Sequence, residues 1–257
     1  MSKLWVYGDS YAVDHANCDW QWYKNLSNIL KVDYKSQADY GVANEWICMK
    51  FIEDYKRNHI ESGDTVIVVM TACVRHWFLW EHPNISNYEN MINWPPGKFG
   101  ITKEQINAVE QYYKHIQKGY VDAWKYDATT AWWNWYTQEL SNKGIGLIIL
   151  PGFNNTTDVL HNGTVPVRGS MFHAVCEAEF TSLEAMDKYY ARGLPDQRVN
   201  HMLKDNHHVL AEGIYNCIKN SKQLVLEDLS WVTKTVSYTH LRAHETGRNL
   251  VCRLLLE

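Results

Sequence analysis

Short runs of apolar residues alternate along the chain with longer segments in which apolar residues recur at helical spacing. The clearest short runs are residues 4–8, 65–71 and 146–150, and a weaker run covers 32–38. The runs at 65–71 and 146–150 are apolar at nearly every position, which is typical of parallel strands buried between two layers of helices. The pattern therefore predicts strands at these four places.

Two of the segments between and after the strands have one apolar stripe at helical spacing. The first covers 44–55, and the second covers 205–218, where Asp205 is available as a helix cap. Alternation of strands and helices with short links predicts an α/β fold, a three-layer α/β/α sandwich around a mostly parallel sheet. We find no internal repeat or low-complexity linker, and we expect one domain over 1–235.

The segment 77–143 is longer than one crossover helix requires, and it is rich in aromatic residues. It contains "HWFLWEHPN", "QYYKHIQKGYVDAWKY" and "AWWNWYTQEL". We interpret it as a helical insertion of two or more long helices, with a loop around Asn93-Trp-Pro-Pro-Gly. Its aromatic side chains either enlarge the core or form a surface on which sugar rings stack.

Composition narrows the class of protein. The chain has 257 residues, 46% hydrophobic and 21% charged, with a net charge of −4. These values indicate a globular protein, and the acidic balance argues against nucleic acid as a partner. No apolar run approaches the ~20 residues of a membrane span. The N-terminus has no signal-peptide pattern and the six cysteines form no Cys-x-x-Cys pair, so we expect a cytoplasmic protein with free thiols.

The C-terminal stretch "TVSYTHLRAHETGRNLVCRLLLE" differs in character from the residues before it. Back-translated, it resembles a sequencing-library adapter read in frame. We therefore expect residues 236–257 to be a non-native tail and the natural C-terminus to lie elsewhere. A genuine amphipathic tail is the alternative.

A Gly-Asp-Ser triplet follows the first predicted strand, in "YGDSYA" at residues 7–12. Ligands of parallel α/β sheets bind beyond the carboxyl ends of the strands, which is where Ser10 would lie. A turn leading into a helix would leave the Ser10 N–H free to stabilise an oxyanion. Ser10 is thus a candidate nucleophile, and a helix-capping serine is the alternative.

A candidate base lies near the other end of the chain. In "LPDQRVNHMLKDNHHVLAEGI", His201 and Ala211 match the pattern H-P-N-x-x-G-H-x-x-x-A that ends the SGNH/GDSL hydrolases. "GDS" matches the first block of that family. "YGVANEWI", with Gly41 and Asn44, is similar to the G-S-S-N-x-x-I form of its phage-associated or metagenomic members. The chain therefore resembles this family from about residue 3 to residue 220.

The resemblance implies a flavodoxin-like sheet and an ester hydrolase with Ser10 as nucleophile and His201 as base. Gly41 and Asn44 would then belong to the oxyanion or substrate site. The family's Gly-x-Asn-Asp block is replaced by "TACVRHW", in which Thr71 or Arg75 would take the place of the asparagine.

The acid of the triad is less clear from the sequence. Arg198 stands where the family has its aspartate, three residues before the histidine. Asp196, five residues before it, could replace this aspartate. Asn200 could instead orient the imidazole, or the site could work as a Ser–His dyad.

The predicted function is hydrolysis of an ester, with an O-acetyl or other small acyl group on a glycan as the substrate. No cofactor and no metal are expected, because the adjacent His207 and His208 would project in different directions and no carboxylate–histidine motif accompanies them. An acyltransferase would use the same residues. The alternative from another class is a non-catalytic binding or virion structural module, with a virion-associated location.

Overall fold

A four-stranded parallel sheet forms the centre of the computed structural model, which describes residues 2–72, 75–77, 102–115, 118–153, 160–172, 174–175 and 199–232. The strands are β1 (Lys3–Gly8), β2 (Asp33–Ala38), β3 (Thr65–Met70) and β4 (Gly146–Pro151). They lie in the order β2-β1-β3-β4, and every neighbouring pair is parallel. This is the strand order of flavodoxin-like sheets. The four predicted strands and the α/β fold class are confirmed.

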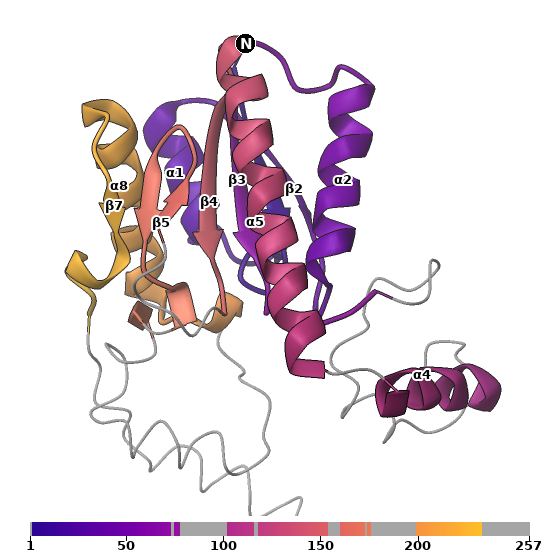
Figure 1. The fold of residues 1–257 in the computed structure, drawn as a ribbon. Coiled ribbons are helices and arrows are strands. Elements are labelled where there is room, and N and C mark those ends of the chain that lie inside the picture. The colour runs from indigo at the N-terminus through magenta and orange to yellow at the C-terminus, as the bar shows by residue number, and fades with distance from the viewer. Residues whose placement is uncertain are drawn as a thin grey trace, which may run out of the picture.

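Helices cover both faces of the sheet (Figure 1). One face carries α1 (Trp22–Leu30) and α8 (Lys204–Asn220), and the other carries α2 (Asn44–Lys56) and α5 (Lys118–Asn142). Because successive side chains of a strand point to opposite faces, β1 sends Leu4 and Val6 into the first core and Trp5 and Tyr7 into the second. The chain is thus a three-layer α/β/α structure.

The predicted helices at 44–55 and 205–218 are α2 and α8. Their predicted stripes face the sheet, with Ile47 and Phe51 of α2 and Leu210 and Ile214 of α8 fully buried. The capping role predicted for Asp205 is wrong. Helix α8 begins at Lys204 after Leu203, no side chain caps it, and Asp205 is already in its first turn.

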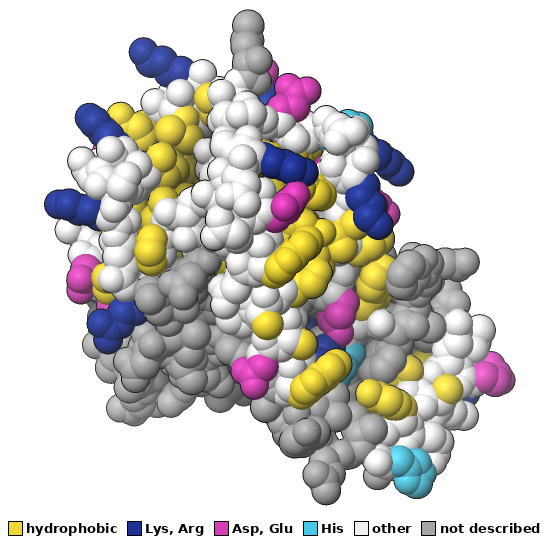
Figure 2. All heavy atoms as spheres, turned by 45° about the horizontal axis from the view of Figure 1, so that its top comes forward, with side chains coloured by type: hydrophobic (Ala, Val, Ile, Leu, Met, Phe, Trp, Pro, Cys, Tyr) yellow, Lys and Arg dark blue, Asp and Glu magenta, His cyan; other side chains and the backbone are white. Residues whose placement is uncertain are grey.

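The aromatic insertion contains two long helices, as predicted: α4 (Lys103–His115) and α5. The predicted loop at 93–97 lies outside the described residues. The aromatic side chains of α5 divide between two environments. Trp133 and Tyr136 are buried against Phe51, whereas Trp124 and Trp135 are each 62% exposed. Figure 2 shows hydrophobic side chains gathered in the middle of the molecule, over α5 and its border with α2.

A second small sheet was not predicted. It consists of β5 (Leu160–Asn162), β6 (Pro166–Arg168) and β7 (Leu224–Val225), and it is joined to β4 by a bridge between Ile148 and Val165. Strands of two or three residues are too short to show a period in the sequence.

Within the described part of the chain, no helix combines the length and the apolar character needed to cross a bilayer. The predicted tail at 236–257 lies outside that part.

Candidate active site

The Gly-Asp-Ser triplet forms a tight turn at the carboxyl end of β1. The Asp9 carboxylate accepts a hydrogen bond from the Tyr11 N–H at 3.1 Å, and the Asp9 carbonyl accepts one from Ala12 N–H at 2.8 Å. Helix α1 begins only at Trp22, and its N-cap is Gln21. The helix expected directly after the turn is therefore absent, and Ser10 does not cap a helix.

Gly8 allows this turn to lie close to the neighbouring strand. A Cβ at this position would come within 2.8 Å of Val69 Cβ, which is closer than packed carbon atoms approach. Close packing against Val69 thus explains a glycine at position 8, independently of any catalytic role.

His201 meets Ser10 although 191 positions separate them in the sequence. The distance from His201 Nε2 to Ser10 Oγ is 2.8 Å, and Ser10 is 8% exposed. His201 ends the short 3₁₀ segment Val199–His201, which precedes α8. When Nδ1 carries the imidazole proton, Nε2 accepts a hydrogen bond from the serine hydroxyl. This is the geometry in which a base can take the proton of a nucleophile.

The backbone at this point adopts an uncommon conformation. Asn200 and His201 have φ values of 47° and 58°, in the left-handed region that residues other than glycine seldom occupy. Such a conformation persists where surrounding contacts impose it.

The side chain of Asn200 supplies such contacts. Its Nδ2 donates to the carbonyls of Ser10 at 2.7 Å and Val13 at 3.2 Å. Its Oδ1 accepts from Gln21 Nε2 at 2.5 Å, and both residues are buried. Asn200 therefore binds the backbone of the serine turn, which differs from the predicted alternative in which it orients the imidazole.

His207 provides a second connection behind the histidine loop. Its Nδ1 accepts a hydrogen bond from the Trp22 N–H at 3.0 Å, and its Nε2 donates to the Val199 carbonyl at 3.1 Å. Burial lowers the pKa of His207 to about 4, so the ring is neutral at neutral pH. It joins the start of α1 to the loop that carries His201.

The adjacent histidines His207 and His208 lie in different environments. Both nitrogens of His207 are engaged with backbone groups, while His208 lies on the surface and pairs with Glu212. The described residues contain no cluster of three His, Cys, Asp or Glu side chains suited to a metal ion.

A buried ion pair lies directly beside Ser10. Asp9 is fully buried, and its Oδ2 lies 2.9 Å from Nη1 of Arg75, whose side chain is 17% exposed. The same Nη1 donates to Thr71 Oγ1 at 2.5 Å, and the guanidinium stands 4.7 Å from the centre of the Phe153 ring. Arg75 therefore lies near the serine turn, with its charge balanced by Asp9.

Asn44 and Thr71 are brought together by two hydrogen bonds. Thr71 N–H donates to Asn44 Oδ1 at 2.9 Å, and Asn44 Nδ2 donates to the Thr71 carbonyl at 3.0 Å. Asn44 is the first residue of α2. Its side chain therefore binds the backbone of Thr71, the residue that follows β3.

Gly41 occupies the turn between β2 and α2 with a φ of 67°, a conformation suited to glycine. The turn follows the strand next to β1, so it lies at the same edge of the sheet as the serine. Asp196 and Arg198 lie outside the described residues.

Two aromatic residues of the site were missed in the sequence. The rings of Tyr11 and Phe153 have centroids 4.9 Å and 5.8 Å from the His201 ring. Phe153 follows β4, so its place after a predicted parallel strand was the available signal. These rings form an apolar wall beside the imidazole.

The chain was compared with family models, curated proteins and solved structures. No family model matches the chain, and no curated protein matches it. The chain is similar to the C-terminal catalytic domain of Streptococcus pneumoniae peptidoglycan O-acetyltransferase A, solved with a methylsulfonyl adduct, with a TM-score of 0.29 and 11% sequence identity. The alignment covers 91% of this chain and 98% of that domain. At this TM-score the likeness carries no argument about fold or function.

Proposed function

We propose that this protein is a serine-dependent enzyme of SGNH type that cleaves an O-acetyl or other small acyl ester on a glycan. The observation that carries the proposal is the 2.8 Å contact between Ser10 Oγ and His201 Nε2 at the carboxyl edge of a parallel sheet. A buried serine turn, a left-handed histidine loop and a buried ion pair support it.

In the proposed mechanism, His201 accepts the hydroxyl proton as Ser10 Oγ attacks the acyl carbonyl. The developing oxyanion is stabilised by the N–H groups of Ser10 and Gly41, with Thr71 or Arg75 as a further donor. The bond between the acyl carbon and the sugar oxygen then breaks, His201 gives its proton to that oxygen, and an acyl-serine and a free sugar hydroxyl are formed. Attack by water on this ester releases the acid, whereas attack by another sugar hydroxyl transfers the acyl group. In the first case the enzyme is a hydrolase, and in the second it is an acyltransferase.

Asp196 is the proposed partner of the second imidazole nitrogen. A carboxylate there would hold the tautomer in which Nε2 is the acceptor. A Ser–His dyad would work without it.

Labelling by a fluorophosphonate probe tests the proposal. We expect the wild-type protein to be labelled, Ser10→Ala to show no labelling, and His201→Ala to lose labelling by several orders of magnitude. His208→Ala is the matched control. His208 lies in the following helix, α8, and its side chain is 60% exposed.

A folded wild-type protein that the probe does not label would contradict the proposal and favour the non-catalytic binding module. If the serine is labelled, release of acetate from an acetylated glycan, measured with and without an added acceptor sugar, distinguishes hydrolysis from transfer.

A further inference from the structure

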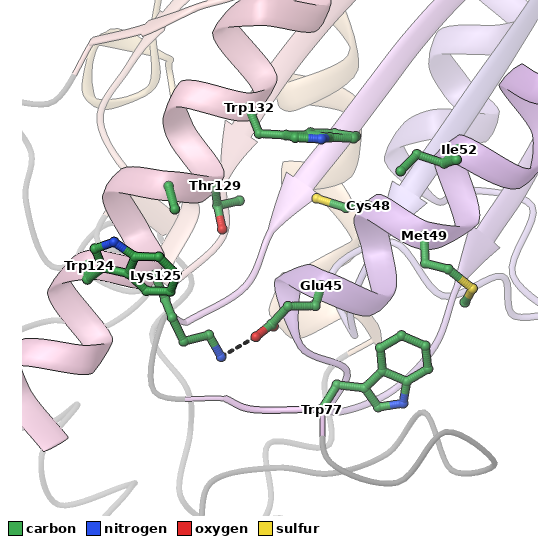
Figure 3. A pocket seen from close by; sticks show the side chains of 10 residues that line it. Glu45, Cys48, Met49, Ile52, Trp77, Trp124, Lys125, Thr129 and Trp132 are labelled. Carbon is green, nitrogen blue, oxygen red and sulfur yellow. Dashed lines mark ion pairs between the residues drawn. The ribbon is translucent and has the colours of Figure 1, made fainter. Parts of the chain in front are cut away.

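A groove of about 530 Å³ lies between α2 and α5, apart from the Ser10–His201 contact (Figure 3). Its volume is within the range of small-molecule sites, about 300–1,000 Å³. Most of its wall is apolar, and three of the ten residues that line it are tryptophans. The lining side chains come from the first turns of α2, the middle of α5 and the segment after β3: Glu45, Cys48, Met49, Ile52, Trp77, Trp124, Lys125, Ala128, Thr129 and Trp132.

One ion pair crosses this groove. Lys125 of α5 pairs with Glu45 of α2, as the dashed line in Figure 3 marks. The Lys125 ammonium also donates to the Arg75 carbonyl at 3.1 Å and lies 3.0 Å from His76 Nδ1. The lining thus has one charge of each sign, and a neutral ligand would match it best.

The loop after β3 connects the groove with the serine turn. The Arg75 side chain binds Asp9, next to Ser10, while the Arg75 carbonyl faces Lys125. On the other side, Glu45 directly follows Asn44, whose amide binds Thr71. The loop after β3 therefore contacts the serine turn through the Arg75 side chain and the groove through the Arg75 carbonyl.

The groove contains no activated nucleophile among its described side chains. Burial and the nearby Glu45 carboxylate raise the pKa of the Cys48 thiol well above its ordinary value, so it is protonated at neutral pH. The groove is therefore suited to binding and not to a second covalent chemistry.

The chemistry of the lining selects the class of ligand. Indole rings pack well against the flat C–H faces of sugar rings, while a carboxylate, an ammonium and the Thr129 hydroxyl can accept and donate hydrogen bonds at the ring edges. A hydrocarbon chain would instead cover the Glu45–Lys125 pair without replacing its solvation, which is unfavourable. An anionic ligand would meet the Glu45 carboxylate.

We propose that this groove binds a neutral oligosaccharide segment and holds the glycan part of the substrate while its acylated residue reaches Ser10. The choice of a glycan rests on the function proposed for Ser10 and His201. Trp124 is the central contact, because it is the most exposed of the three indoles and lies on the groove wall.

Calorimetric titration of the Ser10→Ala protein with neutral trisaccharides tests this proposal. The probes are the β-1,4-linked trimer of N-acetylglucosamine, cellotriose and maltotriose, each up to tens of millimolar. We expect at least one to bind, and Trp124→Ala in the same background to weaken that binding at least about tenfold.

Trp135→Ala is the matched control. Trp135 lies on the same helix with the same 62% exposure, and it is not part of the groove. It is expected to leave saccharide binding unchanged, and circular dichroism would verify that both variants are folded.

The proposal is overturned by any of three results: no trisaccharide binds, Trp135→Ala weakens binding as much as Trp124→Ala, or decanol or adenosine binds more tightly than every sugar. Because the titration uses a protein without the serine hydroxyl, its outcome does not depend on whether Ser10 is a nucleophile. Fluorophosphonate labelling decides that separately.

Discussion

Both faces of the sheet have an apolar core, and they differ in the interactions that accompany it. On the α1/α8 face, next to the serine, directional hydrogen bonds from Asn200, Gln21 and His207 connect segments far apart in the sequence. On the α2/α5 face, the ring of Phe51 packs against those of Trp133 and Tyr136, with centroids 5.3 Å and 5.0 Å away.

The two proposed roles, catalysis at Ser10 and ligand binding in the groove, place different requirements on the two faces. A proton transfer between Ser10 and His201 needs a distance held within a few tenths of an ångström, which hydrogen bonds impose by their direction. A groove that binds a ligand needs shape and apolar surface, which non-directional packing supplies. Changes to the hydrogen bonds that hold the serine turn should therefore affect chemistry more than stability, and changes to the aromatic cluster around Phe51 should do the reverse.

The largest expected effect is on the second face. Phe51→Ala removes a fully buried ring from the centre of the aromatic cluster, and we expect it to lower the free energy of unfolding by about 3–5 kcal/mol. Urea unfolding followed by circular dichroism would measure this. The labelling rate per folded molecule should stay near that of the wild type.

Phe51→Leu is the control for this variant, because it keeps much of the apolar volume and should recover part of the stability. A Phe51→Ala protein that is as stable as the wild type but fails to label would reverse the assignment of roles to the two faces.

An intermediate effect is expected from Asn200→Ala. The substitution removes the Asn200 donor to the Ser10 carbonyl and one of the two acceptors of Gln21 Nε2, which still donates to the Val13 carbonyl, and it places alanine in a left-handed conformation. We expect the fluorophosphonate labelling rate to fall about 100-fold, as a misplaced base would produce.

Asn206→Ala is the matched control for this change. Asn206 is also buried and also makes two hydrogen bonds to backbone, with the N–H and carbonyl of Val232. Its loss should cost a similar amount of stability, about 1–3 kcal/mol, without slowing labelling. Equal slowing in both variants would mean that Asn200 acts only through stability.

The last expected effect is absent at neutral pH and appears only in acid: a pH dependence of stability from His207. Its pKa is about 4 in the folded protein and 6.5 ordinarily, so below pH 6.5 the unfolded chain binds the proton more strongly. The contribution of His207 to the free energy of unfolding is therefore highest above about pH 6.5. It decreases as the pH falls toward 4, by about 1.4 kcal/mol per pH unit.

His207→Gln isolates this contribution, because glutamine can donate to Val199 and accept from Trp22 without titrating. Subtracting the unfolding free energies of this variant from those of the wild type, measured between pH 4 and 7, should give the predicted slope. A difference that does not vary with pH would refute the assignment of a neutral, buried His207.

The strands of the central sheet and two of the helices that cover it were accessible from the sequence because each has its own local pattern. The runs at 65–71 and 146–150 were typical of strands buried on both faces, and α2 and α8 were recognisable from their stripes. The capping role of Asp205 was predicted wrongly, since a helix start is fixed by backbone geometry within a residue or two and many polar residues nearby can appear suitable.

Ser10 and His201 were found as candidates because they lie in short motifs with recognisable spacing. The residues that hold them could not be found in this way. Gln21 and Asn200 are 179 positions apart, and nothing in either local segment indicates the other. The aromatic insertion likewise left two interpretations open, and the structure places Trp133 in the core and Trp124 on the wall of the groove.

The sequence by itself thus determined the four strands of the central sheet, the helices α2 and α8 and the two side chains that could carry the chemistry, because periodicity and motifs are properties of neighbouring residues. Only the tertiary structure decided which distant side chains bind the serine turn, that His207 is a buried neutral link, and where the aromatic surface forms a groove. These depend on how the layers pack, and packing brings together residues that no local pattern relates.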